Sequence, residues 1–206
     1  MKLYVTPGSP YARMARIVVL EKGLERRVEV IFAQTRTAGS PYYEINPSGR
    51  VPYLVRDDGV GLEESALICA WLDQLDGKPA FGLPAGEAGW EARRLEALAR
   101  SLMDGLSVWL RELYRPPNER SPGVIRHEMD RAARMAELWE REIKHSCMRG
   151  ALNMAQLTLA CALGIEARNP HLDWRSGHGA LAQWYENVAG RPSFAATAPP
   201  AATRVK

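Results

Sequence analysis

Near the start of the chain stands Lys2-Leu3-Tyr4-Val5-Thr6-Pro7-Gly8-Ser9-Pro10-Tyr11-Ala12-Arg13-Met14-Ala15-Arg16, an apolar run, a turn and a helical pattern in succession. The pattern predicts that Ser9 is the N-cap of a helix and that Pro10 is its first residue. Unpaired N–H groups and the positive end of the helix dipole at such a point favour an anion. The hydroxyl of Ser9 therefore either only caps the helix or also holds a negatively charged ligand.

The sequence up to residue 77 alternates between strand and helix patterns. Two strands around the first helix predict a parallel pair with a right-handed crossover. The turn Asp57-Asp58-Gly59 between two apolar runs predicts a hairpin, so the sheet is expected to be mixed. The expected elements are strands over 2–5, 27–32, 53–56 and 60–62, helices over 10–23 and 65–76, and a helical turn over 40–45.

Beyond residue 77 the strand patterns end. Residues 77–89 are rich in Gly and Pro and read as a linker, and the Ala/Pro-rich tail 195–202 is expected to be extended. The predicted domains are 1–77, of α/β type, a linker over 78–88, and an all-helical domain over 89–206. The helices of the second domain are expected over 90–114, 122–144, 153–163 and 178–189.

The composition indicates an ordinary soluble globular protein of 206 residues with a net charge of +3. Its 27 basic and 24 acidic residues form no basic run, which argues against a nucleic-acid-binding protein. The sequence shows no secretory signal pattern and no apolar stretch of membrane-spanning length. Three cysteines without CxxC spacing suit a reducing cytoplasm, the expected location, and the four histidines lack the spacing of metal ligands.

Two further motifs in the first domain are candidates for binding a ligand. Val51-Pro52 precedes a predicted strand, where proline is common as a strand-entry residue. We predict that the Val51–Pro52 bond is cis, which would leave the N–H and C=O of Val51 free to pair with an extended peptide. Glu64-Ser65 begins a predicted helix, either as a plain cap or as a site where Ser65 holds a carboxylate and Glu64 faces an ammonium. Together with Ser9, these groups suit a small peptide that has a free amino-acid end and a reactive anion.

Over its whole length, the sequence resembles the glutathione S-transferase family. The resemblance is carried by Ser9-Pro10-Tyr11, Asn46-Pro47-Ser48-Gly49-Arg50-Val51-Pro52 and Glu64-Ser65, in the family's order and spacing. Asn153-Met154-Ala155-Gln156 stands where the family usually has a Ser/Thr-x-x-Asp box. The resemblance implies a thioredoxin-like N-terminal domain followed by a C-terminal helical bundle.

The resemblance also implies a role for each motif. Ser9 is expected to donate a hydrogen bond to the thiolate of glutathione, unless a backbone N–H of Tyr11 or Ala12 does so instead. The expected glutathione-binding residues are Arg50, Val51, Pro52, Glu64 and Ser65. Arg50 is assigned to the glycyl carboxylate, with a solvated loop arginine as the alternative. Because Ser9 is not a cysteine, thiol transfer through a mixed disulfide at this position is disfavoured.

The second substrate is expected to be a small hydrophobic electrophile or a peroxide. Its pocket is assigned to Tyr11, Met103, Ser107, Leu110, Tyr114 and Phe194, although a Met and Leu stripe is also typical of plain core. Glutathione is expected as a co-substrate, with no metal. The resemblance further implies a homodimer, for which Tyr42 and Tyr43 are candidate contacts.

Three functions compete for this sequence. The leading hypothesis is a glutathione transferase, and the alternative is a non-catalytic binding or regulatory protein with the same fold. Ser9 and Glu64-Ser65 favour the enzyme, because an interaction module does not need them. A serine hydrolase that uses Ser9 is disfavoured, since the first domain has neither a G-x-S-x-G elbow nor a histidine.

Overall fold

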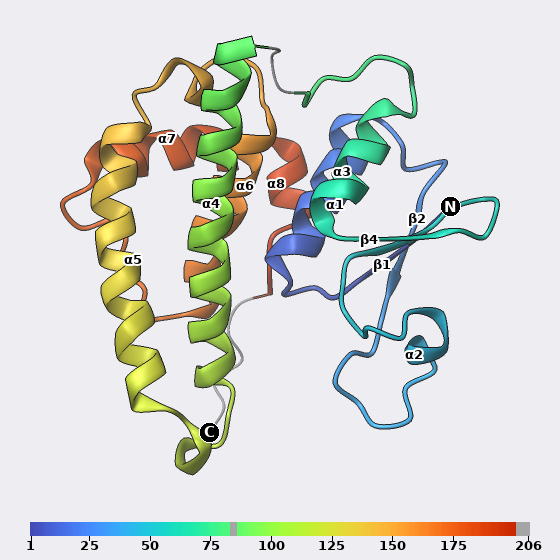
Figure 1. Ribbon diagram of the computed structural model, residues 1–206, viewed down its shortest axis with the longest axis horizontal. Helices are drawn as coiled ribbons and strands as arrows, with labels where there is room; N and C mark the ends of the chain where they lie inside the picture. Colours follow the sequence, from blue (N-terminus) through green and yellow to red (C-terminus); the bar gives the residue numbers. More distant parts are fainter. Residues whose placement is uncertain (83–85, 201–206) are drawn as a thin grey trace. The chain divides into compact units, whose positions relative to one another are not determined.

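The computed structural model describes residues 1–82 and 86–200, which divide into two compact units (Figure 1). The first unit contains Met1–Gly82 and Pro192–Pro199, and the second contains the helices α4 to α7. All of 89–206 was expected in the helical domain, whereas the segment Pro192–Pro199 packs with the first unit. Residues 83–85 of the expected linker lie outside the described residues.

A four-stranded mixed sheet forms the centre of the first unit, in the order β2-β1-β3-β4. Strand β1 runs parallel to β2, as the βαβ pattern predicted, and β3 runs antiparallel to β4, as the hairpin predicted. The antiparallel pairing of β1 with β3, which joins these two pairs into one sheet, is seen only in the structure. Helices α1 and α3 pack against each other beside the sheet (Figure 1). The elements are β1 (Lys2–Val5), α1 (Pro10–Glu21), β2 (Glu29–Phe32), α2 (Tyr42–Ile45), β3 (Tyr53–Val55), β4 (Gly61–Glu63) and α3 (Ser65–Gln74).

The ends of α1 and α3 are joined by a buried lysine. The ammonium of Lys22, whose side chain is 4% exposed, lies 3.3 Å from a carboxylate oxygen of Asp73 and 2.9 Å from one of Asp76. Burial alone would lower the pKa of Lys22, but its bonds to the two carboxylates raise it instead. Asp73 also accepts hydrogen bonds from the backbone N–H groups of Ala80 and Phe81, at 2.8 and 3.0 Å. The chain that leaves α3 is thereby held against the first unit.

The second unit is a bundle of helices in which α4 packs against both α5 and α6. Every residue of α6 is buried, in agreement with a sequence that is apolar apart from Gln156 and Thr158. Gly105 lets α4 approach α5, because a Cβ at this position would lie 2.4 Å from an Oε of Glu128. The long elements are α4 (Gly86–Leu113), α5 (Pro122–Glu142), α6 (Met154–Leu163) and α7 (Gly179–Ala189), with 3-10 turns η1 (Pro117–Glu119), η2 (Ser146–Met148) and η3 (Gly164–Arg168).

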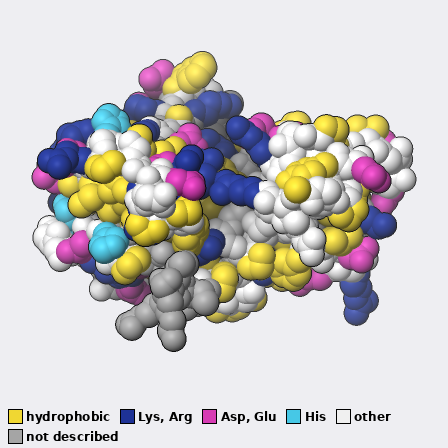
Figure 2. All heavy atoms as spheres, turned by 90° about the horizontal axis from the view of Figure 1, so that it is seen from below, with side chains coloured by type: hydrophobic (Ala, Val, Ile, Leu, Met, Phe, Trp, Pro, Cys, Tyr) yellow, Lys and Arg dark blue, Asp and Glu magenta, His cyan; other side chains and the backbone are white. Residues whose placement is uncertain are grey.

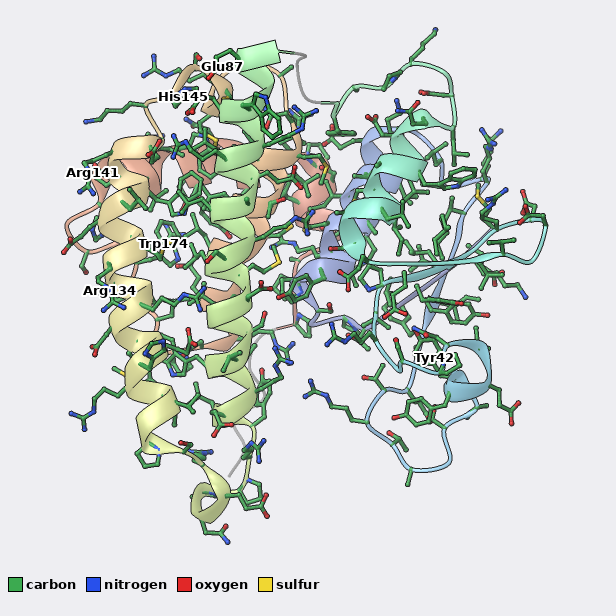
Figure 3. All side chains as sticks on the ribbon, viewed as in Figure 1. Tyr42, Glu87, Arg134, Arg141, His145 and Trp174 are labelled. Atoms are coloured by element: carbon green, nitrogen blue, oxygen red, sulfur yellow. The ribbon has the colours of Figure 1, made fainter. Side chains whose placement is uncertain are left out.

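The exposed and buried faces of α5 follow its sequence period. Ala132, Ala136 and Trp139 are buried, whereas Arg134 and Arg141 are exposed on the outer side of the helix (Figure 3). Trp174, in the loop after η3, is 2% exposed, and its indole N–H donates to the carbonyl of Leu163 at 3.2 Å. Large buried indoles therefore fill much of this bundle's core.

Two expectations about helix boundaries need correction. Helix α4 begins at Gly86 rather than at residue 90, so part of the expected linker is helical, and Glu87 in its first turn suits the helix dipole. Residues 192–196 form the short helix α8 (Pro192–Ala196), although the tail from residue 195 was expected to be extended. The buried guanidinium of Arg13 holds this segment, because it donates to the carbonyl of Phe194 at 3.0 Å and to the hydroxyl of Thr197 at 3.4 Å.

Candidate functional site

Ser9 lies at the N-terminus of α1 and caps it. Its Oγ accepts a hydrogen bond from the backbone N–H of Ala12 at 3.2 Å, and Pro10 occupies the first turn, as predicted. A serine hydroxyl has one O–H to donate as well as lone pairs to accept with. The cap uses a lone pair, so the O–H of Ser9 can still donate to an anion. Capping and ligand binding are therefore compatible at this residue.

The peptide bond between Val51 and Pro52 is cis, as predicted. Among the described residues, no group forms a hydrogen bond with the backbone N–H or C=O of Val51. The neighbouring carbonyl of Arg50, in contrast, accepts from the hydroxyl of Tyr42 and from Nδ2 of Asn46, the latter at 3.0 Å. The backbone is thus fixed on one side of Val51, while Val51 itself presents an unpaired donor and acceptor.

Glu64 and Ser65 form the junction between β4 and α3. Glu64 adopts φ 78°, which is unusual for a residue with a side chain and costs on the order of 1–3 kcal/mol. Its carbonyl already accepts from Ile68, so the left-handed turn aligns the start of α3. The side chain of Glu64 is 70% exposed, whereas Ser65 is 2% exposed. Strained conformations of this kind often occur at ligand sites.

The strand register brings these three motifs to one end of the sheet. Tyr53, at the start of β3, pairs with Tyr4 near the end of β1 and with Glu63 at the end of β4. Ser9 follows β1, Val51 precedes β3, and Glu64 follows β4, so all three lie at the same end of these strands, which is called the binding edge below. A hydrogen bond also connects two of these segments at the binding edge: the hydroxyl of Ser48, in the loop before Val51, donates to an Oε of Glu63 at 2.7 Å.

Arg50 lies on the surface at this edge. One of its guanidinium nitrogens is 3.9 Å from an Oε of Glu64, and the two side chains are 75% and 70% exposed. Such an exposed and distant ion pair contributes little to stability. Arg50 therefore remains available to a ligand, and its assignment to a glycyl carboxylate stays a prediction.

Known proteins share the sequence pattern of this chain. The family model described as "Glutathione S-transferase, N-terminal domain" matches residues 8–75. The chain is 30% identical over 205 residues to the "Uncharacterized GST-like protein YibF" of Escherichia coli (strain K12), which covers 98% of this chain and 100% of that protein. The chain belongs to the glutathione S-transferase family.

Solved structures of this family share the whole fold. A glutathione transferase family member from Pseudomonas fluorescens Pf-5, with bound S-(propanoic acid)-glutathione, is 34% identical and covers 97% of this chain and 100% of its own, with a TM-score of 0.84. A glutathione S-transferase from Methylobacillus flagellatus KT with glutathione bound is 30% identical, covers 97% and 99%, and has a TM-score of 0.84. The thioredoxin-like domain and the helical C-terminal part expected from the sequence are therefore confirmed.

The residues expected to bind the second substrate of this glutathione S-transferase family member differ in exposure. Tyr11 is partly exposed and Tyr114 is 42% exposed. Met103, Leu110 and Phe194 are at most 6% exposed, and the guanidinium of Arg13 lies 5.4 Å from the centre of the Phe194 ring. Burial favours the core alternative for Met103 and Phe194. Ser107 is 8% exposed, and its hydroxyl has no hydrogen-bond partner among the described residues.

Sequence reasoning missed the residues that support the binding edge. Tyr42, expected at a dimer contact, is 3% exposed because its ring packs near Tyr4 and its hydroxyl donates to the carbonyl of Arg50. Figure 3 shows Tyr42 on α2. Burial raises the pKa of the Tyr42 hydroxyl, which keeps it a donor. Asn46 caps its own turn by accepting from Ser48, and the Asn-Pro-Ser-Gly composition was the available signal for this role.

Other kinds of site are not indicated within residues 1–82 and 86–200. These residues contain no group of three or more His, Cys, Asp or Glu side chains that could hold a metal ion. None of the helices in the same ranges is both long enough and apolar enough to cross a bilayer. On the face shown in Figure 2, acidic and basic side chains are interspersed rather than sorted into one basic surface.

Proposed function

We propose that this family member is a glutathione transferase that activates the thiol of glutathione for attack on a small hydrophobic electrophile or a peroxide. The observation that carries the proposal is the meeting of Ser9, Val51 and Glu64-Ser65 at one edge of the sheet. Relatives with bound glutathione or a glutathione conjugate, at 30–34% identity, support the choice of ligand.

Glutathione would bind along this edge by backbone and charge contacts. The unpaired N–H and C=O of Val51 offer two hydrogen bonds to the cysteinyl backbone, in the manner of an added strand. Pro52, in the cis bond, fixes the direction in which Val51 presents these groups. The N-terminus of α3 at Ser65 suits the γ-glutamyl carboxylate, and the carboxylate of Glu64 suits its ammonium. Arg50 suits the glycyl carboxylate.

Ser9 would lower the pKa of the bound thiol. A free cysteine thiol has a pKa of about 8.5, so little thiolate exists at neutral pH. A hydrogen bond from a hydroxyl to a charged group contributes about 1.5–3 kcal/mol, which lowers a pKa by roughly one to two units. The dipole of α1 acts in the same direction. These contributions would generate a nucleophile without a separate base.

The direct test is retention on immobilised glutathione, followed by conjugation of glutathione to an aryl halide. Glu64→Gln removes the charge that would face the γ-glutamyl ammonium, so retention is expected to weaken by about tenfold or more, the scale of a lost charge-assisted bond. Glu25→Gln is the matched control, because Glu25 is an exposed carboxylate of the same unit. Equal retention of the two variants would contradict the assigned site.

The same experiment separates the enzyme from the non-catalytic alternative. Retention with measurable conjugation supports the transferase, and a peroxide assay distinguishes reduction from conjugation. Retention without either activity over a panel of electrophiles would favour a binding or regulatory protein. We also propose a homodimer and a cytoplasmic location, the latter because the three cysteines are thiols rather than disulfides.

A further inference from the structure

A cysteine, a histidine and a glutamate lie together in the helical unit. Cys147 is in η2, His145 directly precedes this turn after the end of α5, and Glu91 is on α4. The Sγ of Cys147 is 2.9 Å from Nδ1 of His145, and Nε2 of His145 is 3.9 Å from Oε2 of Glu91. Figure 3 shows His145 at the end of the bundle where α4 begins. A thiol beside an imidazole that a carboxylate faces is the arrangement of a nucleophile and its base.

The hydrogen bonds of His145 fix which nitrogen carries the lone pair. The backbone N–H of Cys147 donates to Nδ1 at 3.2 Å, so His145 is the N-cap of η2. A protonated Nδ1 cannot accept this bond. In the neutral ring, therefore, Nδ1 accepts and Nε2 carries the hydrogen that faces Glu91. The Sγ of Cys147 lies 2.9 Å from the same nitrogen, so the thiol and the backbone N–H share its one lone pair, and the backbone bond opens when Nδ1 takes a proton.

The turn that carries Cys147 is held in place by two other helices. The carbonyl of Cys147 accepts hydrogen bonds from Nδ2 of Asn153 at 2.8 Å and from Nε2 of Gln156 at 3.2 Å, and both of these residues lie at the N-terminus of α6. The carbonyl of Met148 accepts from the indole N–H of Trp184 on α7 at 2.8 Å. The distance between thiol and imidazole is thus set by a rigid support rather than by a free loop.

Burial favours the protonated form of the Cys147 thiol. It raises the pKa of the thiol and Glu91 raises this pKa further, whereas the backbone N–H of Cys147 and the guanidinium of Arg94 lower it. Arg94 in turn binds Glu91 and Glu142 through its guanidinium nitrogens, at 2.9–3.1 Å. The carboxylate of Glu91, 3.9 Å from Nε2, faces the ring that would receive the proton. Because the thiol is the form favoured at rest, proton transfer from Sγ to Nδ1 belongs to the attack itself rather than to a step before it.

Cys147 also differs in exposure from the other two cysteines. Cys69 and Cys161 are 0% and 1% exposed, whereas Cys147 is partly exposed. A reagent in solution can therefore reach Cys147 while the other two thiols are covered. The protein provides its own internal controls for thiol reactivity.

We propose that Cys147 is a modification site that reacts with small-molecule disulfides, with His145 as the base. Nδ1 of His145 takes the proton as Sγ attacks one sulfur of the disulfide, the disulfide bond breaks, and a mixed disulfide forms at Cys147. The second sulfur leaves as a thiolate and receives the proton from His145. Cys147 is oxidised, and the disulfide is the oxidant that is reduced. This step is independent of the glutathione site proposed above.

The experiment uses the full-length protein and the neutral probe 4,4′-dithiodipyridine, with the released thione followed by absorbance. Cys147→Ser is expected to abolish the fast phase. His145→Asn is the decisive variant, because an asparagine can keep the N-cap of η2 but cannot serve as a base. Its fast-phase rate at about pH 7 is expected to be at least tenfold lower than that of the unaltered protein. The ratio of the two rates, that of the unaltered protein to that of His145→Asn, should fall towards one as the pH rises through the raised pKa of the Cys147 thiol, above which Sγ ionises without a base.

A second measurement identifies the adduct. Incubation with glutathione disulfide is expected to add one glutathionyl group, which peptide mapping places on Cys147. The proposal is overturned if Cys147 reacts no faster than the buried thiols. It is also overturned if His145→Asn leaves the rate at about pH 7 unchanged, or lowers it by the same factor at every pH. If His145→Asn does not fold, Glu91→Gln replaces it, with the same pH-dependent loss expected and an unchanged rate refuting the role of the cluster.

Discussion

Replacing Ser9 by alanine tests the proposed chemistry most directly, because it removes two different interactions of known size. The first is the cap on α1, in which Oγ accepts from the N–H of Ala12 at 3.2 Å. Its loss is expected to cost about 1 kcal/mol of folding free energy. In a chain of 206 residues this lowers Tm by about 2–4 °C.

The second interaction is the proposed hydrogen bond from the hydroxyl of Ser9 to the glutathione thiolate. Its loss would raise the pKa of the bound thiol by roughly one to two units, towards about 8.5. At pH 7 the thiolate fraction would then fall roughly 8- to 25-fold, and turnover would fall with it. Above about pH 8.5 the thiol ionises without Ser9, so the loss of turnover should shrink there. Binding of glutathione should change little, because Val51 and Glu64-Ser65 hold the peptide.

The assay is turnover with an aryl halide from about pH 6 to pH 9.5, together with thermal unfolding of each protein. Ser121→Ala is the matched control for capping. Ser121 is also an N-cap followed by proline, and its Oγ accepts from the N–H of Val124 at 3.4 Å. This variant should lose similar stability and keep the turnover of each folded molecule. Ser9→Thr retains a hydroxyl and should restore much of the activity near neutral pH.

Two results would refute the assignment of Ser9. If Ser9→Ala lowers only Tm, as Ser121→Ala does, then Ser9 is a cap alone. A turnover loss of the same factor at every pH would mean that Ser9 does not act on thiol ionisation. If glutathione binding persists in the first case, a backbone N–H of Tyr11 or Ala12 becomes the candidate donor to the thiolate.

Three further predictions concern the fold and assembly. Glu140 accepts from two backbone N–H groups at the start of α7, at 3.0 and 2.8 Å; burial raises its pKa, but these bonds lower it below the ordinary value of 4.5 overall. The stabilisation by the Glu140 carboxylate is therefore complete above pH 4.5 and is lost as the pH falls through the lower pKa of the folded protein. The difference in free energy of unfolding between the unaltered protein and Glu140→Gln, measured with urea, should then become smaller in acid. A difference that stays constant with pH would contradict this. Limited proteolysis should cut first within 77–89 or in the Ala/Pro tail, and early cleavage inside α1 or α6 would argue against the proposed domains. Light scattering at micromolar concentration should give the mass of a dimer, and a monomer would refute the proposed homodimer.

The elements of the chain follow from local sequence signals. Ser9 with Pro10, and Ser121 with Pro122, begin α1 and α5 where capping preferences place them. The turn at Asp57-Asp58-Gly59 joins two antiparallel strands, and the apolar sequence of α6 is buried throughout. These features were predictable because each depends on residues a few positions apart.

The candidate site was predictable only as a set of separate motifs. The sequence indicated Ser9, Val51-Pro52 and Glu64-Ser65, but their meeting at one edge depends on which strands pair and in which register. The φ of 78° at Glu64 is likewise a property of the folded chain.

Contacts between residues distant in the sequence were decided only by the tertiary structure. Arg13 buries its guanidinium against the carbonyl of Phe194, 181 positions away, and so holds the C-terminal segment against the first unit. Glu140 caps α7 from α5, a role that no sequence near α7 indicates. Such contacts escape local reasoning because their energy comes from burial and satisfied hydrogen bonds, and these exist only once the distant segments have packed together.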